Sequence, residues 1–331
     1  MAKTIALQTV EIGKESTWGT PVAASKKLAG ITSIELQSLS EVSDFPSLEG
    51  YAPMYQSDIV RTGATATIES LVVYEDLPIW LDSLLAEDAT PTGAGPYTYV
   101  YEAPLTAAPT RSFYTIQYGD SDTAYCITGA LVKSVTISGS AGEALSMSIE
   151  IVGHHIATDT MDGNSDRTVN IATARQTVLS MNAVSSAPGV TAIACSTFDF
   201  EISLDNATAV VYQIGAITPC DYFQNRMDGM VNLTMEFPGP SDEVADLYDA
   251  FIGTTPAKQS QNIELKASNG ANLDIELQCS GVLMSAPSVW SDSDGVTTME
   301  LEFKMQYNAN VGASGNFFAA NVINGISDQF A

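Results

Sequence analysis

A two-residue alternation of apolar and polar side chains recurs along this chain and leaves few folds open to it. Between 299 and 307, apolar residues take the odd positions, while Glu300, Glu302, Lys304 and Gln306 take the even ones. Similar alternation runs through 145–151, 198–204, 231–237 and 273–279. Successive side chains of a strand point to opposite faces, so each segment predicts a strand with one buried and one polar face. The pattern predicts a mostly antiparallel all-β protein, a sandwich or a set of barrel-forming sheets.

Two segments have the features of a helix. In 75–85, acidic residues occupy the first turn and Pro78 is tolerated near the start. In 241–252, Ser241 can cap the first turn and apolar residues recur at helical spacing. Each segment directly follows a predicted strand.

That parallel points to an internal repeat. The segment 32–39 resembles 197–204, and 113–153 resembles 263–307, with Cys126 and Cys279 each lying just before a glycine. We interpret the resemblance as a divergent tandem duplication with one short helix per repeat. The predicted units are an N-terminal arm at 1–30, a β domain at 31–155, a connector at 156–190, a second β domain at 191–308 and a C-terminal tail at 309–331. Because the tail carries several large apolar residues, we expect it to dock on its own domain or on a neighbour.

Charge and composition exclude several functions. The 331 residues include 13 basic and 39 acidic ones, for a net charge of −26, so static nucleic-acid binding is not expected. Only 16% of residues are charged, a low share for the surface of a soluble monomer. Subunit contacts are one explanation, and an abundance of Ser, Thr, Ala and Gly is the other. The N-terminus lacks the apolar stretch of a signal peptide, and no apolar run is long enough to span a membrane. We expect a protein made and kept soluble in the cytoplasm.

The sequence offers little chemistry for an enzyme. His154 and His155 are adjacent, so on a strand they point to opposite faces and do not share a metal. The acidic segment 159–166 is the best candidate for a calcium loop, but it lacks the spacing of an EF-hand and a linker turn is favoured. The four cysteines are widely separated and form no zinc motif. We expect no catalytic residue, no cofactor and no metal site.

The opening segment 10–24, Val-Glu-Ile-Gly-Lys-Glu-Ser-Thr-Trp-Gly-Thr-Pro-Val-Ala-Ala, resembles the start of the major tail tube proteins of long-tailed bacteriophages. The strand-then-helix segment 64–86 and the predicted strands at 97–99, 112–117 and 129–138 follow that family's order. The resemblance implies a β-sandwich subunit with a flanking helix, whose sheets join those of its neighbours around a channel. For a two-domain member it implies stacked rings of three chains with pseudo-sixfold symmetry, with six chains as the alternative.

The resemblance also implies partners and a location. The chain would assemble with itself in the host cytoplasm, join a tape measure protein and tail-end proteins, and become part of the virion tail. Double-stranded DNA would pass through the channel without specific binding, and no membrane would be involved. Carboxylates on the polar faces of strands are the candidates for lining that channel: Glu69, Glu150, Glu236, Glu300 and Glu302. Aromatic residues outside the repeats are the candidates for contacts between rings: Trp18, Phe317, Phe318 and Phe330.

Other classes stay open at this stage. A phage tail terminator or a capsid decoration protein would share the same composition. A secreted β-sandwich binding module would share the strand pattern, but it should show a signal peptide and exposed aromatic clusters. An enzyme fits least well, because no nucleophile, base or metal cluster can be assembled from these residues.

Overall fold

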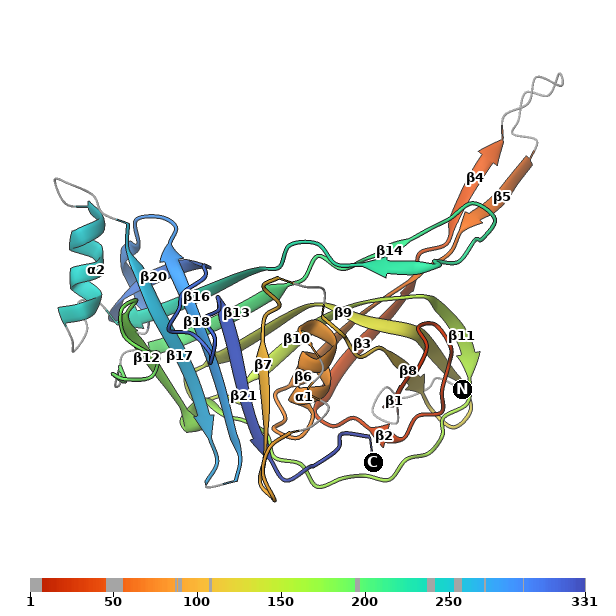
Figure 1. Cartoon of the computed structure of the whole chain (residues 1–331), viewed down its shortest axis with the longest axis horizontal. Coiled ribbons are helices and arrows are strands. Elements are labelled where there is room, and N and C mark those ends of the chain that lie inside the picture. The colour runs from red at the N-terminus through yellow and green to blue at the C-terminus, as the bar shows by residue number, and fades with distance from the viewer. Residues whose placement is uncertain are drawn as a thin grey trace.

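Figure 1 shows the computed structural model of the chain, which describes residues 8–45, 56–86, 88, 91–106, 109–193, 197–236, 242–252, 258–270, 272–293 and 295–330. The first half contains β1 Thr9–Lys14, β2 Lys26–Lys27, β3 Ile31–Ser38, β4 Glu41–Phe45, β5 Gln56–Arg61, β6 Ala64–Leu71, α1 Leu77–Leu84, β7 Tyr97–Glu102, β8 Tyr114–Gly119, β9 Ala124–Ser140, β10 Ser146–Gly153 and β11 His155–Asp159. The second half contains β12 Thr177–Ala183, β13 Thr197–Asp205, β14 Ala209–Val211, β15 Asp221–Phe223, β16 Asp228–Glu236, α2 Asp242–Ile252, β17 Ser260–Ser268, β18 Asp274–Leu283, β19 Ser288–Ser293, β20 Val296–Met305 and β21 Phe318–Asn324. The mostly antiparallel all-β fold and both helices predicted from the sequence are confirmed.

One long antiparallel sheet runs through both halves. Its strands pair in the order β3, β6, β10, β9, β13, β16, β20 and β19. The pairing of β9 with β13 joins the halves, because β9 belongs to the first half and β13 opens the second. The two predicted domains therefore share a continuous sheet.

A second layer covers the apolar face of the long sheet. In the first half β2, β1, β8, β9 and β11 pair in that order. In the second half β12, β17, β18 and β21 pair in that order, and β21 then pairs with β7 of the first half. The strands β9 and β18 run through both layers, since their early residues pair in the second layer and their later residues pair in the long sheet. Gly281 lies at this crossing in β18, where a Cβ would come within 2.7 Å of the Phe303 Cβ. A larger residue there would force the two layers apart.

The order of pairing in the first half recurs in the second. In the first half the order is β3, β6, β10 and β9. In the second half β13, β16 and β20 take the places of β3, β6 and β10, and β18 and β19 together take the place of β9. Backbone bonds match too, because His154 N donates to Thr128 O just as Gln306 N donates to Ser280 O. The recurring order includes the arm and the connector. The strand β1 of the arm pairs with β8, just as β12 of the connector pairs with β17. Both segments, expected to lie outside the repeats, contribute strands to the second layer.

Buried side chains of both halves form a single apolar cluster. Every residue of α1 is buried, and Trp80 is 1% exposed. Leu81 O accepts from the N–H of the C-cap residue Leu85, whereas the carbonyls of Asp82, Ser83 and Leu84 have no donor further along the helix. Their donors come from elsewhere in the chain: Ser112 N, Arg111 Nε and Asn206 Nδ2, respectively. Asn206 follows β13, so the second half supplies part of the cap on the helix of the first.

The C-terminal segment lies between the two halves. Its strand β21 pairs with β18 on one side and with β7 on the other (Figure 1). Asn324 Nδ2 donates to Tyr74 O at 3.0 Å, and Tyr99 Oη donates to Ile326 O at 2.9 Å. The tail thus docks within its own chain and ties β7 of the first half to the second half.

Candidate functional site

The long sheet has one polar face that is not covered by the second layer. Along β16, Asn232, Thr234 and Glu236 alternate with the buried Val231, Leu233 and Met235. Hydrogen bonds between side chains of adjacent strands mark this face across both halves: Ser148 to Glu69 at 2.7 Å, Ser138 with Ser146 at 2.9 Å, and Asn232 to Glu201 at 3.1 Å. The polar face is therefore one surface that crosses the junction between the halves.

All the carboxylates predicted to line a channel lie on this polar face. Glu69, Glu150, Glu300 and Glu302 are exposed, and Glu236 is partly exposed. Strand register adds further acids to the same face, which the sequence analysis did not single out: Glu35, Asp199, Glu201, Asp205 and Asp228. The alternation in 198–204 could have identified two of them.

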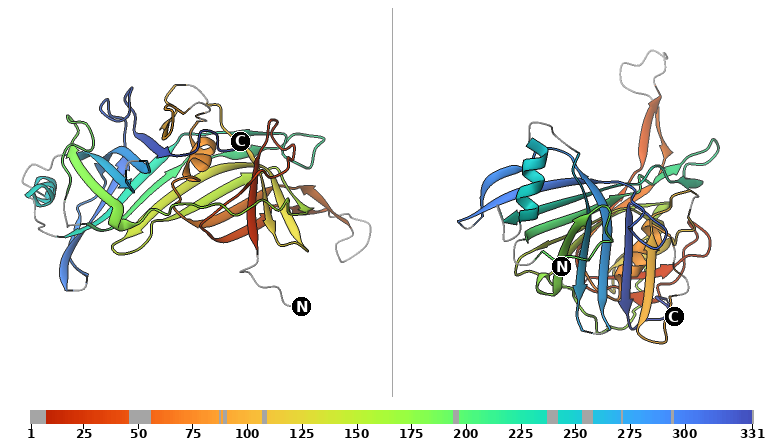
Figure 2. Two further views of the ribbon diagram at one scale, coloured as in Figure 1. Left: turned by 90° about the horizontal axis from the view of Figure 1, so that it is seen from below. Right: turned by 60° about the vertical axis from the view of Figure 1, so that its left-hand side comes forward.

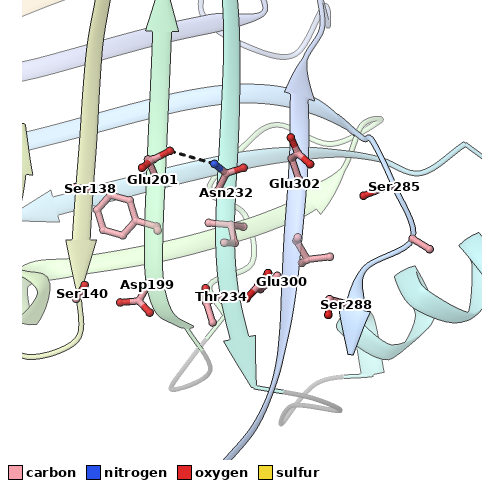
Figure 3. Close-up of a pocket in the computed structure, with 14 residues that line it drawn as sticks. Ser138, Ser140, Asp199, Glu201, Asn232, Thr234, Ser285, Ser288, Glu300 and Glu302 are labelled. Atoms are coloured by element: carbon pink, nitrogen blue, oxygen red, sulfur yellow. Dashed lines mark hydrogen bonds between the residues drawn. The ribbon is translucent and has the colours of Figure 1, made fainter. Parts of the chain in front are cut away.

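The polar face is hollowed where β9, β13, β16, β20 and β19 lie side by side (Figure 3). The hollow has a volume of about 600 Å³. Asp199, Glu201, Glu300 and Glu302 line it together with serine, threonine and asparagine side chains. This part of the polar face is thus concave and acidic.

Lysines offset part of this negative charge. Lys133 Nζ lies 2.9 Å from Glu150 Oε2, and Lys304 Nζ lies 3.7 Å from Asp228 Oδ1. The hydrogen bond with Glu150 raises the pKa of Lys133, and the same bond lowers the pKa of Glu150. Both partners are partly exposed, so the pair contributes little to stability. Glu150 is accordingly the least available of the predicted carboxylates for repelling an anion.

The long sheet ends in two strands with an open edge. Within the part of the chain that the structure describes, β3 pairs only with β6, and β19 pairs only with β20. Unpaired backbone donors and acceptors at a sheet edge are templates for another strand. The protein therefore presents one such edge at each end of the same sheet.

Two hairpins arise at equivalent places in the repeated pairing. The hairpin β14–β15 follows β13 and lies over the first half, where Thr62 N donates to Ile217 O at 2.7 Å. The hairpin β4–β5 follows β3 and projects away from the body of the chain (Figures 1 and 2). It exposes 61% of Val42, 45% of Phe45 and 47% of Ile59. The β14–β15 hairpin thus lies on the first half, whereas the described part of the β4–β5 hairpin leaves these apolar side chains exposed.

A comparison with models of protein families identifies the family of this chain. A family model described as phage tail tube protein matches residues 6–305. The chain belongs to the phage tail tube protein family. The match spans both halves and confirms the resemblance to phage tail tube proteins, so the protein is a structural component of the virion tail that assembles with itself into a tube and has partners in the tail. A search of curated proteins found no match for the chain.

The aromatic residues predicted to lie at contacts between rings of this tail tube protein all have contacts within the chain. Phe318 is 1% exposed, and its backbone pairs with Cys279. Phe317 and Phe330 are partly buried against the core, and the Phe330 ring lies 5.5 Å from the Tyr114 ring. Phe318 thus packs within the chain, and the role of Phe317 and Phe330 at contacts between rings stays a prediction.

Trp18 anchors the arm to the first half. Its Nε1 donates to Gly129 O at 2.8 Å, and its ring meets the edge of the His154 ring at 5.2 Å. Burial lowers the pKa of His154, with a further contribution from the charge of His155. The Trp18 ring also lies 5.6 Å from the Tyr222 ring of the β14–β15 hairpin. The side chain joins the arm to the second half of the same chain.

The acidic segment 159–166 is engaged in bonds to the arm. Asp162 accepts from Ala24 N at 2.7 Å, and Asn164 donates to Glu11 at 2.6 Å. Among the described residues, no group of His, Cys, Asp and Glu is placed to hold a metal ion. In the same residues, no helix is long and apolar enough to cross a membrane.

Proposed function

We propose that three copies of this tail tube protein close into a ring with the long sheet as its inner wall, and that stacked rings form the tube of a long-tailed phage. The observation that carries the proposal is a continuous sheet whose polar face is acidic and hollowed between β9 and β19, and which, among the described residues, has an open edge at each end. The other face is buried under the second layer, so only the acidic face is available to an aqueous channel. Closing such a sheet on itself removes its edges.

The ring size follows from the recurring pairing. Two halves with the same strand order occupy quasi-equivalent positions, so three chains supply six such units. A tandem duplication of one ancestral unit accounts for this order. Head-to-tail contacts between identical chains close when the rotation per subunit divides a full turn.

An acidic wall suits the passage of double-stranded DNA. The duplex carries one negative charge per ~1.7 Å of its axis, and basic side chains would hold it through counterion release. Carboxylates instead repel the phosphates and keep the duplex away from the wall. The proposed channel therefore conducts DNA without binding it.

Purified protein is expected to form rings of three chains that look sixfold in projection. Class averages from electron microscopy would show six similar lobes, while the native mass of a single ring would equal three chains. Six chains per ring would contradict the trimer and leave the tube itself standing. A monomer at all concentrations, with no rings or tubes, would contradict the proposed function.

Changing the five predicted channel carboxylates to glutamine is expected to leave ring assembly intact and to slow DNA ejection. The wall then loses five charges per chain, so its repulsion of the duplex weakens. A matched control removes five exposed acids that lie outside the long sheet: Asp122, Glu143, Asp221, Asp249 and Asp328. Phage carrying either variant would be compared for tail length and for the rate of ejection. Equal rates in the two variants would argue against an acidic channel wall.

A further inference from the structure

We propose that adjacent copies join by antiparallel pairing of β19 in one chain with β3 in the next, in the register of the internal β9–β13 junction. The inference rests on the proposed function, and it names the partner strand and the residues that meet. It starts from the fact that β9 and β13 already make a junction between two units of the same strand order. The chain therefore contains a template for the contact between chains.

The strand β19 takes the place of the end of β9. Both strands lie beside equivalent neighbours, because β10 and β20 occupy the same position in the repeated order. On β10, Ser148 lies opposite Thr136, and on β20, Glu300 lies opposite Ser288. Ser148 and Glu300 correspond, because each lies six residues before one of the matching backbone donors His154 N and Gln306 N. Ser288 therefore corresponds to Thr136.

The strand β3 takes the place of β13. In the first half Ile34 pairs with Ile68, and in the second half Phe200 pairs with Leu233. Ile68 and Leu233 correspond, because Ile149 pairs with the first and Leu301 with the second. Ile34 therefore corresponds to Phe200, and three residues further on Gln37 corresponds to Ser203. The internal junction pairs Thr136 with Ser203, so the contact between chains should pair Ser288 with Gln37.

The incomplete burial of apolar side chains on β3 indicates that a neighbouring strand is missing at this edge. Phe200 and Ile202 on β13 are 7% and 2% exposed, and β9 flanks them. Ile34 and Leu36 hold the corresponding places on β3 but are only partly buried. A second copy paired along β3 would cover them as β9 covers β13.

The positions of the two hairpins also support pairing of β3 with β19 of the next copy. In the template, β14–β15 follows β13 and lies over the unit that β13 joins, where Tyr212 packs against Arg61 at 5.6 Å. The hairpin β4–β5 follows β3 and extends past the edge of its own chain (Figure 2). Pairing β3 with β19 of the next copy places this hairpin over the second half of that copy. The exposed Val42, Phe45 and Ile59 then gain a surface to cover.

Cysteine pairs introduced into full-length protein test the register. In the background protein, the exposed Cys220 is replaced with serine, and so is Cys195. Cys126 and Cys279 are kept, because they are buried and do not react with the reagent. In this background, Ser288→Cys with Gln37→Cys should give covalent dimers and trimers when assembled tubes are treated with a short bifunctional thiol reagent. Such a reagent avoids the strict geometry of a disulfide.

Two further pairs serve as matched controls. The internal counterpart, Thr136→Cys with Ser203→Cys, should cross-link within the chain and give no oligomers, because these residues are opposite each other in the structure. The shifted pair, Ser288→Cys with Ser33→Cys, moves four residues along β3 on the same face, about 13 Å away, and should cross-link poorly.

The outcomes separate this inference from the proposed function. Covalent trimers from the Ser288 and Gln37 pair alone would support the register. Tubes that form normally, with the internal control cross-linked and the Ser288 and Gln37 pair left monomeric, would overturn it. Equal cross-linking by the shifted pair would overturn it as well. A background protein that forms no rings would instead contradict the proposed function, and this inference with it.

Discussion

A chain that ends before Val311 is expected to lose its cooperative thermal unfolding transition and to collect in the insoluble fraction. Removing residues 311–331 deletes β21, which is an interior strand of the second layer. The facing edges of β18 and β7 would both lose their backbone partners. Differential scanning calorimetry and the soluble yield of the truncated protein would measure the effect.

The magnitude follows from the side chains that lose cover. Phe318 and Val322 are 1% and 0% exposed, and their neighbours Leu277, Tyr99 and Tyr101 are also buried. Each fully buried apolar side chain contributes about 1.5–3 kcal/mol. Deleting Phe318 and Val322 therefore removes about 3–6 kcal/mol, and Leu277, Tyr99 and Tyr101 lose part of their cover as well. This loss is comparable with the net stability of a folded domain, about 5–15 kcal/mol.

A point substitution gives the same test in a soluble protein. Phe318→Ala should lower the free energy of unfolding by about 3–5 kcal/mol, because it leaves a cavity in the core. Phe223→Ala is the matched control, since Phe223 is 49% exposed, and it should change stability by less than about 0.5 kcal/mol. Equal effects of the two substitutions, or a truncated chain that still melts cooperatively, would show that the tail is not part of the core.

The sequence predicted the polar face because its signal is local. Alternation along one strand sets which side chains share a face, so Glu300 and Glu302 could be placed together without knowing the neighbours of β20. The common face of Glu69 and Glu236 depends on pairings between distant strands. It follows only from the register through β10, β9 and β13.

The sequence could not place the arm, the connector and the tail for a related reason. Their strands are short, or lie among polar residues, and their partners are far away in the chain. For example, β1 pairs with β8 across about a hundred residues, and β21 pairs with β7 across more than two hundred. An apolar residue such as Phe318 gives the same sequence signal whether its cover comes from its own chain or from a neighbour. The sequence therefore could not show that Phe318 packs within its own chain, and the predicted contacts between rings stay a prediction.

The cap at the end of α1 could not be predicted from the sequence either. Arg111 and Asn206 are 3% and 0% exposed, yet both are polar residues with no local motif. Arg111 donates to Ser83 O at the end of the helix, to Val132 O on β9 and, at 2.8 Å, to Thr208 Oγ1. Burial lowers the pKa of Arg111 to about 10. The guanidinium is held in the core by hydrogen bonds that tie both halves together.

Arg111→Lys is therefore expected to destabilise the protein by about 3 kcal/mol or more. Lysine keeps the charge but cannot reproduce the planar fork, so at least two hydrogen bonds to a charged donor are lost, each contributing about 1.5–3 kcal/mol. Arg111→Met should cost less than Arg111→Lys, because it removes the buried charge along with the bonds. Chemical denaturation of the purified variants would measure each change.

The pH dependence of the stability shows whether a variant changes the buried charge or only the packing. The pKa of Arg111 is lowered in the folded state, so the cost of burying its charge is fully present at neutral pH and falls only as pH rises above about 10. The methionine variant should lack this gain in alkali, whereas the native chain keeps it. Arg226→Lys is the control, because the Arg226 side chain is 83% exposed and no stability change is expected. An Arg111→Lys variant as stable as the native chain would show that the fork across Ser83, Val132 and Thr208 does not hold the two halves together.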